Sequence, residues 1–128
     1  MNVPEGLKYT NEHVWLKIED DKVRLGITDF AQDLLGEINN VELPEVGKMI
    51  KKDDLLITLE SLKSVFDVLS PLNGKICEVN TALTDQPASI NKTPFEQGWM
   101  VVLEEINTAD LEGLLTSQDY QKHLSEIS

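Results

Sequence analysis

Apolar and polar residues alternate over several short stretches of this chain, which is the pattern of strands with one buried face. Residues 14–19 and 22–27 flank the turn-forming pair Asp20-Asp21 and therefore predict a hairpin. Other β-rich runs are bounded by Pro, Gly, Asn or Asp, and they predict strands at 38–43, 55–59, 65–69, 74–79 and 99–104. The pattern predicts a mainly β fold.

The period becomes helical in only a few places. Between 28 and 36, Thr28 can cap a helix and Gly36 can end it. A helical turn is predicted at 80–85, and 108–128 is predicted to be a C-terminal helical extension packed on the domain. The expected caps of the tail are Thr108 and Ser117, and the expected irregular segments are 1–13 and 86–98.

A short internal echo supports a closed arrangement of strands. Residues 44–50, Pro-Glu-Val-Gly-Lys-Met-Ile, resemble residues 71–77, Pro-Leu-Asn-Gly-Lys-Ile-Cys. The two copies lie on either side of the runs 55–59 and 65–69. This placement predicts a flattened barrel of two similar halves with the intervening hairpin exposed at one end, although two unrelated Pro-to-Gly turns would look similar.

That hairpin carries a lysine at its tip. Lys63 lies in the polar break between the two β-rich runs, so its stem is expected to lie off the core and its amine in water. Another enzyme could grip and acylate such an amine. On turn geometry alone, however, an ordinary solvating lysine is the better interpretation, because loops are normally polar.

Composition and charge narrow the function. The 128 residues suit one domain, 1–128, with its own core. The net charge of −12, from 23 acidic and 11 basic side chains, argues against nucleic-acid binding and suits basic rims on protein partners. The N-terminus lacks a secretory signal, and no apolar run could span a membrane, so a cytoplasmic setting is expected.

Few residues could form an active site. The two histidines, His13 and His123, lie near opposite ends of the chain, and with the single Cys77 they lack the spacing of metal ligands. Cys77 lies in an apolar run and is expected to be a packing residue. No phosphate-binding loop or nucleophile elbow is present. The sequence therefore predicts a non-catalytic protein that carries another molecule's reactive group.

The residues around Lys63 resemble those of a known family. Glu60-Ser61-Leu62-Lys63-Ser64, followed by Asp67 and Ser70-Pro71, is similar to the lipoylation hairpin of the glycine cleavage system H-protein family. The resemblance covers roughly residues 7–124 in order. Its other segments are Leu7-Lys8-Tyr9-Thr10, Glu12-His13, Gly26-Ile27-Thr28-Asp29-Phe30-Ala31-Gln32, Leu35-Gly36, 41–47, Glu78-Val79-Asn80 and Gly98-Trp99-Met100.

This resemblance implies the lipoyl-domain fold, a barrel-sandwich hybrid, with lipoate joined to Lys63 by an amide bond. It also implies an attachment and docking motif, made of Glu60, Ser61, Leu62, Ser64 and Asp67. In the family, the arm carries an aminomethyl group from glycine decarboxylase to aminomethyltransferase and electrons to dihydrolipoyl dehydrogenase. A lipoyl-attaching enzyme is a further implied partner, and a shuttle that visits several enzymes is expected to be a monomer.

The chain departs from the family near the implied arm cleft. Val14 replaces an acid in the segment Glu12-His13-Val14-Trp15, and Asn39-Asn40 interrupt an apolar run. Glu12, His13, Val14, Asn39 and Asn40 are therefore the candidate cleft residues. Valine cannot accept a hydrogen bond from an amine, so these changes leave the pathway open. The alternative is an H-protein-like lipoate carrier that serves sulfur oxidation with a heterodisulfide-reductase-like complex, or lipoate relay.

The lysine itself allows two further hypotheses. Biotin carriers place their lysine between methionines, whereas Lys63 lies between Leu62 and Ser64, which makes a biotin carrier the weaker interpretation. The second hypothesis is an unmodified structural domain, and such a domain would show no lipoyl adduct after expression with a lipoylating enzyme.

Overall fold

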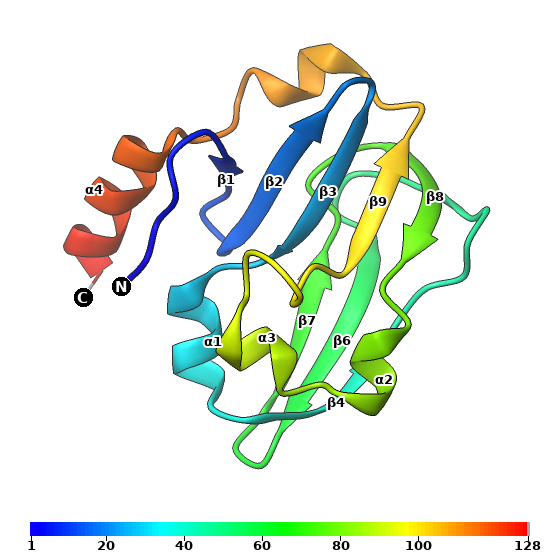
Figure 1. The fold of residues 1–128 in the computed structure, drawn as a ribbon. Helices are drawn as coiled ribbons and strands as arrows, with labels where there is room; N and C mark the ends of the chain where they lie inside the picture. Colours follow the sequence, from blue (N-terminus) through cyan, green and yellow to red (C-terminus); the bar gives the residue numbers. More distant parts are fainter. Residues whose placement is uncertain (128) are drawn as a thin grey trace.

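The computed structural model describes residues 1–127, so the last residue of the expected 108–128 extension lies outside the described residues. Two antiparallel sheets form the body of the molecule, and short helices lie at its edges (Figure 1). The strands are β1 (Lys8–Tyr9), β2 (Val14–Glu19), β3 (Lys22–Ile27), β4 (Ile38–Glu42), β5 (Met49–Ile50), β6 (Leu55–Ser61), β7 (Val65–Leu69), β8 (Gly74–Val79) and β9 (Val101–Glu104). The helices are α1 (Asp29–Leu35), α2 (Ala82–Asp85), α3 (Ser89–Lys92), the 3₁₀ helix η1 (Thr108–Leu111) and α4 (Ser117–Ile127). The mainly β prediction is confirmed.

The strand order explains which segments meet. The larger sheet runs β1-β2-β3-β9-β8-β5, and the smaller sheet runs β4-β6-β7. The predicted 14–27 hairpin is formed by β2 and β3, with Trp15 opposite Gly26. A Cβ at Gly26 would lie 2.9 Å from the indole Nε1 of Trp15, so only glycine fits under that ring. The indole in turn donates a hydrogen bond of 3.0 Å to the Pro94 carbonyl.

The core lies between the two sheets. It is built from alternate residues of facing strands, among them Leu16, Leu25, Ile57, Leu59 and Ile76, all essentially inaccessible to water. Burying such side chains contributes about 1.5–3 kcal/mol each. Alternate strand residues therefore fill this core. Trp15, Leu56 and Val102 lie between those positions and are buried as well.

The two echoed segments pair with each other. β5 and β8 run antiparallel, with Met49 opposite Lys75 and Ile50 opposite Gly74. The amide of Ile76 donates a hydrogen bond of 2.9 Å to the Lys48 carbonyl just beyond this pair. The two similar segments thus form one edge of the larger sheet. The two sheets contain six and three strands, however, so the halves are unequal.

Several local predictions were wrong. The segment 86–98 contains α3, and the irregular lead-in contains β1. Asn107 and Thr116, rather than Thr108 and Ser117, supply the side-chain oxygens that accept from the first backbone amides of η1 and α4. In both cases the residue before the expected cap takes that position, because Asn and Thr serve as caps as readily as their neighbours do.

The C-terminal segment packs against the edge of the larger sheet. Tyr9 and Leu115 exchange two backbone hydrogen bonds of 2.9 and 2.8 Å. The Tyr120 ring of α4 stacks on the Tyr9 ring, with centroids 4.7 Å apart, and both side chains are buried. Backbone pairing and aromatic burial together hold α4 beside β1, as Figure 1 shows.

Candidate functional site

The turn of the β6–β7 hairpin contains Lys63. The hairpin protrudes at one end of the molecule (Figure 1). The strands pair from Leu55 and Leu69 to Glu60 and Val65. The chain then reverses over a turn in which the Ser61 amide donates to the Ser64 carbonyl at 2.9 Å. The Val-, Ile- and Leu-rich runs on both sides favour strands, and the polar residues between them favour the turn.

A single hydroxyl organises this turn. Ser61 Oγ accepts hydrogen bonds of 3.2 Å from the amides of Lys63 and Ser64. It also lies 3.4 Å from the Ser64 carbonyl, to which it donates. A serine at the first position of a turn commonly binds the backbone two and three residues on. The backbone that presents Lys63 is therefore held by a side chain of the predicted motif.

The tip is exposed, and it is apolar beside the lysine. Leu62 is 91% exposed and Val65 is 64% exposed, whereas the side chains of Leu59 and Val68 behind them are buried. Lys63 is exposed too, and none of the ion pairs found within residues 1–127 involves it. A primary amine in this setting is accessible to an enzyme that forms an amide bond.

The Lys63 side chain lies across the end of α1. A Cβ built on Gly36 would be 3.5 Å from Lys63 Cε and 3.6 Å from Nζ. Gly36 has a φ of 78°, and its amide donates to the Gln32 carbonyl at the helix end. A left-handed φ of this kind favours glycine. The expected helix stop is confirmed, and it also leaves room for the lysine.

Glu60 and Asp67 lie on the outer face of the small sheet. Asp67 pairs with Thr58, two residues from Glu60, so the two carboxylates share the face opposite to the buried Leu59. Asn40 donates a hydrogen bond of 3.0 Å to Glu60, and Thr58 donates one of 3.2 Å to Asp67. The hairpin thus carries acidic groups below an exposed lysine.

The candidate cleft residues are spread over different surroundings. Val14 is 2% exposed and belongs to the core, whereas Glu12 lines a surface cavity of about 370 Å³ with Asp53 and Asp110. Asn39 is exposed on β4. Of the five candidates, Asn40 contacts the predicted attachment motif through the hydrogen bond that it donates to Glu60.

His13 lies in a polar cluster under α4. Its Nδ1 is 2.8 Å from the Tyr120 hydroxyl, which is also 2.7 Å from Thr28 Oγ1. Partial burial and the nearby His123 lower the pKa of His13 from its usual value. Burial raises the pKa of Tyr120 to about 12. Both groups are therefore neutral near pH 7, and they tie α4 to the start of β2.

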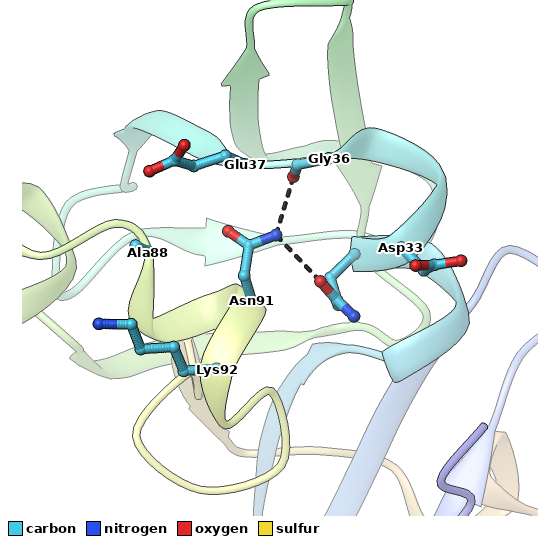
Figure 2. Close-up of a pocket in the computed structure, with 7 residues that line it drawn as sticks. Asp33, Gly36, Glu37, Ala88, Asn91 and Lys92 are labelled. Atoms are coloured by element: carbon cyan, nitrogen blue, oxygen red, sulfur yellow. Dashed lines mark hydrogen bonds between the residues drawn. The ribbon is translucent and has the colours of Figure 1, made fainter.

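A second cavity, beside Lys63, could not be predicted from the sequence. It measures about 340 Å³ and lies between α1 and α3, where Gly36 and Ala88 contribute small side walls (Figure 2). Asn91 Nδ2 donates to the Gly36 carbonyl at 2.8 Å and to Gln32 Oε1 at 3.0 Å. Because α3 was expected to be loop, nothing in the sequence indicated that Asn91 meets the end of α1.

Residues 1–127 offer neither a metal centre nor a membrane anchor of the helical kind. Within this range, no three His, Cys, Asp or Glu side chains are grouped so that they could hold a metal ion. Over the same residues, none of the helices combines the length and apolar character needed to cross a bilayer.

Together, the paired sheets and the exposed hairpin lysine define a lipoyl-type carrier domain. A sequence model of the glycine cleavage H-protein family matches residues 7–127. The chain belongs to the glycine cleavage H-protein family, and its role is that of a lipoyl carrier in glycine cleavage.

Individual relatives agree over almost the full length. The chain is 47% identical to the glycine cleavage system H protein of Bacillus licheniformis, with 98% of this chain and 99% of the relative covered. It is 48% identical to that of Listeria monocytogenes serotype 4a, with 97% and 99% covered. The crystal structure of a Mycobacterium marinum glycine cleavage system H protein superposes with a TM-score of 0.87 at 35% identity, covering 96% and 99%. The expected lipoyl-domain fold is confirmed, and neither sulfur oxidation nor lipoate relay is favoured.

Proposed function

We propose that lipoate is joined to Lys63 Nζ by an amide bond and that Lys63 is the only lipoylated residue. The carrying observation is the exposed amine at the end of a hairpin whose turn is held by Ser61. Lipoate supplies the sulfurs that take up the one-carbon group and the electrons. The arm from Cα to the dithiolane is about ten bonds long, on the order of 14 Å.

The protein's own residues position the arm. Ser61 fixes the path of the backbone at Lys63, while Glu60 and Asp67 offer acidic contacts to the lipoyl-attaching enzyme. Leu62 and Ser64 complete the docking motif at the tip. Because the arm is tethered, its effective concentration at a docked enzyme is far above that of free lipoate.

The partners follow from family membership. We propose that the arm serves glycine decarboxylase, aminomethyltransferase and dihydrolipoyl dehydrogenase in turn, in the cytoplasm, and that the carrier is a monomer without catalytic activity of its own. The candidate cleft of Glu12, His13, Val14, Asn39 and Asn40 stays a proposal. The hydrogen bond that Asn40 donates to Glu60 supports this cleft.

We further propose that residues 1–128 act as one carrier unit, with 108–128 as a helical extension. The support is the burial of Tyr120 and its bonds to His13 and Thr28. Limited proteolysis should leave the extension attached. Rapid release of an intact 1–107 fragment would contradict this organisation.

The central experiment is lipoylation followed by peptide mapping. The protein is incubated with a lipoyl-attaching enzyme, and the intact mass is measured before digestion. We expect one adduct on Lys63 and none in Lys63→Ala. Lys52→Ala removes an exposed lysine from a different turn and should be modified normally. An adduct on Lys75, or one that persists in Lys63→Ala, would overturn the assignment.

A further inference from the structure

The outer edge of β7 has no role in the function described so far. β7 is the last strand of the smaller sheet, and within residues 1–127 no further strand pairs with its far side. Proteins usually protect such an edge, because its N–H and C=O groups can pair with another chain. This edge begins directly after the turn that contains Lys63.

The other sheet edges in the described part of the chain are short or interrupted. β1 and β5 have two residues each, and β1 also pairs with the segment before α4. β4 has a bulge between Ile38 and Asn40, and the Ile38 amide is bound to Asn91 Oδ1. β7 has five residues, and the irregularity in its pairing lies on β6. Its edge is therefore long and regular enough to accept another strand.

The pairing register shows which backbone groups of β7 face outward. The Ser61 amide donates to the Ser64 carbonyl, so these two residues form a hydrogen-bonded pair. Hydrogen-bonded and non-hydrogen-bonded pairs alternate along an antiparallel ladder. The next residue of β7, Val65, therefore turns its N–H and C=O away from β6, and so does Asp67, two residues further on.

The side chains along this edge suit an extended protein segment. Val65 is 64% exposed and Leu69 is 42% exposed, and Asp67 is exposed between them. Alternate residues share one face of a strand, so these three side chains form a row that is apolar, acidic and apolar. A strand with a basic residue between two apolar residues complements this row, because apolar pairs and opposite charges across strands are favourable.

We propose that the lipoyl-attaching enzyme binds this edge by adding an extended segment of its own as a further strand of the smaller sheet. The proposal rests on the attachment of lipoate to Lys63 proposed above. In strand addition, main-chain hydrogen bonds supply affinity and the alternate side chains supply specificity. The added strand lies beside β7 and so fixes the position of the hairpin tip in the active site.

The reach of the lysine favours this enzyme as the occupant. An unmodified lysine side chain extends only about 6 Å from the backbone, so an enzyme that acylates Nζ must approach the hairpin closely. Enzymes that act on the finished arm work at its far end, on the order of 14 Å from the backbone. The edge next to the turn is therefore most useful to the enzyme that attaches the arm.

The first test measures amide hydrogen exchange of the unmodified carrier by NMR. The carrier is studied alone and with enough lipoyl-attaching enzyme to saturate the shifts of the hairpin tip, without the acyl donor, so that no lipoate is transferred. We expect the amides of Val65 and Asp67 to exchange about tenfold more slowly in the complex. The amides of Phe66 and Val68 face β6 and are the internal controls, protected in both states.

Three results would overturn the proposal. The first is unchanged exchange at Val65 and Asp67 in the saturated complex, and the second is new protection on β4 instead. The third is protection that grows with the concentration of the carrier alone, which would show that a second copy occupies the edge. Peptide mapping tests Lys63 separately, so a lipoylated Lys63 with unprotected β7 amides contradicts strand addition alone.

The second test removes one outward N–H. Val65→Pro does this at an edge position, where sheets tolerate proline, and Val65→Ala is the matched control that keeps the amide. We expect kcat/KM for lipoylation to be about fivefold lower in Val65→Pro than in Val65→Ala, the effect of one hydrogen bond. Equal values in two folded variants would contradict the proposal. If the proline opens the hairpin, the exchange measurement on the unchanged chain decides.

Discussion

At the scale of single residues, the hydroxyl of Ser61 decides how firmly the lysine is presented. Removing it in Ser61→Ala leaves the amides of Lys63 and Ser64 without this acceptor. Since the turn is exposed, water replaces the bonds, and unfolding free energy should fall by only about 1 kcal/mol. We expect slower lipoylation, measured by intact mass over time, and a melting temperature lowered by only a few degrees.

Ser64→Ala is the matched control for this prediction. Within residues 1–127, the Ser64 hydroxyl makes no hydrogen bond, while its backbone groups bind Ser61. Because Ser64 belongs to the proposed docking motif, its loss should slow lipoylation, but less than the loss of Ser61, which also removes the turn's hydrogen bonds. If lipoylation of both variants slows equally, the enzyme recognises the two hydroxyls directly. That result would contradict a role of Ser61 in holding the turn.

Glu60 provides a prediction about recognition rather than geometry. The Glu60 carboxylate accepts a hydrogen bond from Asn40 at the surface. Replacing such surface groups usually changes the free energy of unfolding by less than about 0.5 kcal/mol. Glu60→Ala should therefore slow lipoylation while the melting temperature hardly moves. Glu42→Ala, on the neighbouring strand, is the control and should be modified normally. A large loss of stability with normal lipoylation would show that Glu60 is structural.

The role of a single residue could be predicted from the sequence where its contacts lie close to it along the chain. Lys63, its turn and its flanking acids lie within one hairpin, so a local pattern describes them. The contact of Lys63 with Gly36 joins segments 27 residues apart, and no local pattern predicts it. Val14 shows the same limit, because its replacement of an acid was visible but its place in the core was not.

At the scale of elements, the length of a strand or helix decided whether the sequence predicted it. Strands with five or more residues in β-rich runs, such as β2, β3 and β7, were predicted with nearly correct bounds. α3 and β1 have four and two residues, too few for a period to be seen. Both form because of partners elsewhere, α3 through Asn91 and β1 through β2 and Leu115.

The attachment of α4 leads to a prediction about pH. The groups that face His13 are Tyr120 and His123 of α4, with Phe30 and Thr28 nearby. Because the pKa of His13 is lowered in the folded protein, the unfolded chain binds the proton more readily. The contribution of His13 to the free energy of unfolding is therefore fully present above the ordinary histidine pKa of about 6.5. It is lost as the pH drops below that value.

Urea unfolding between pH 5 and 8 measures this effect. The part of the slope due to His13 should stay below about 1.4 kcal/mol per pH unit, the limit for one proton. His13→Asn is the useful variant, since His13 has a φ of 69° and asparagine tolerates that region. It should flatten the pH dependence. An unchanged slope would show that His13 does not link α4 to pH.

At the scale of the whole molecule, charge governs how partners are met. A net charge of −12 should steer the carrier toward basic surfaces, and salt should screen that attraction. Raising the ionic strength from about 0.05 to 0.5 M should therefore lower kcat/KM for lipoylation while leaving kcat nearly unchanged. A free short peptide substrate spanning residues 58–69 is the control, because it lacks most of the charge. Equal salt sensitivity of protein and peptide would contradict long-range steering.

The hairpin that displays Lys63 has one tip, and this has a consequence for traffic. Two enzymes cannot hold the same tip at once, so the carrier works in series rather than in parallel. Each partner is then a competitor of the others, whatever reaction it performs. An excess of any one enzyme therefore occupies the carrier and delays the others. The flow of carbon through the system then depends on how quickly each enzyme dissociates.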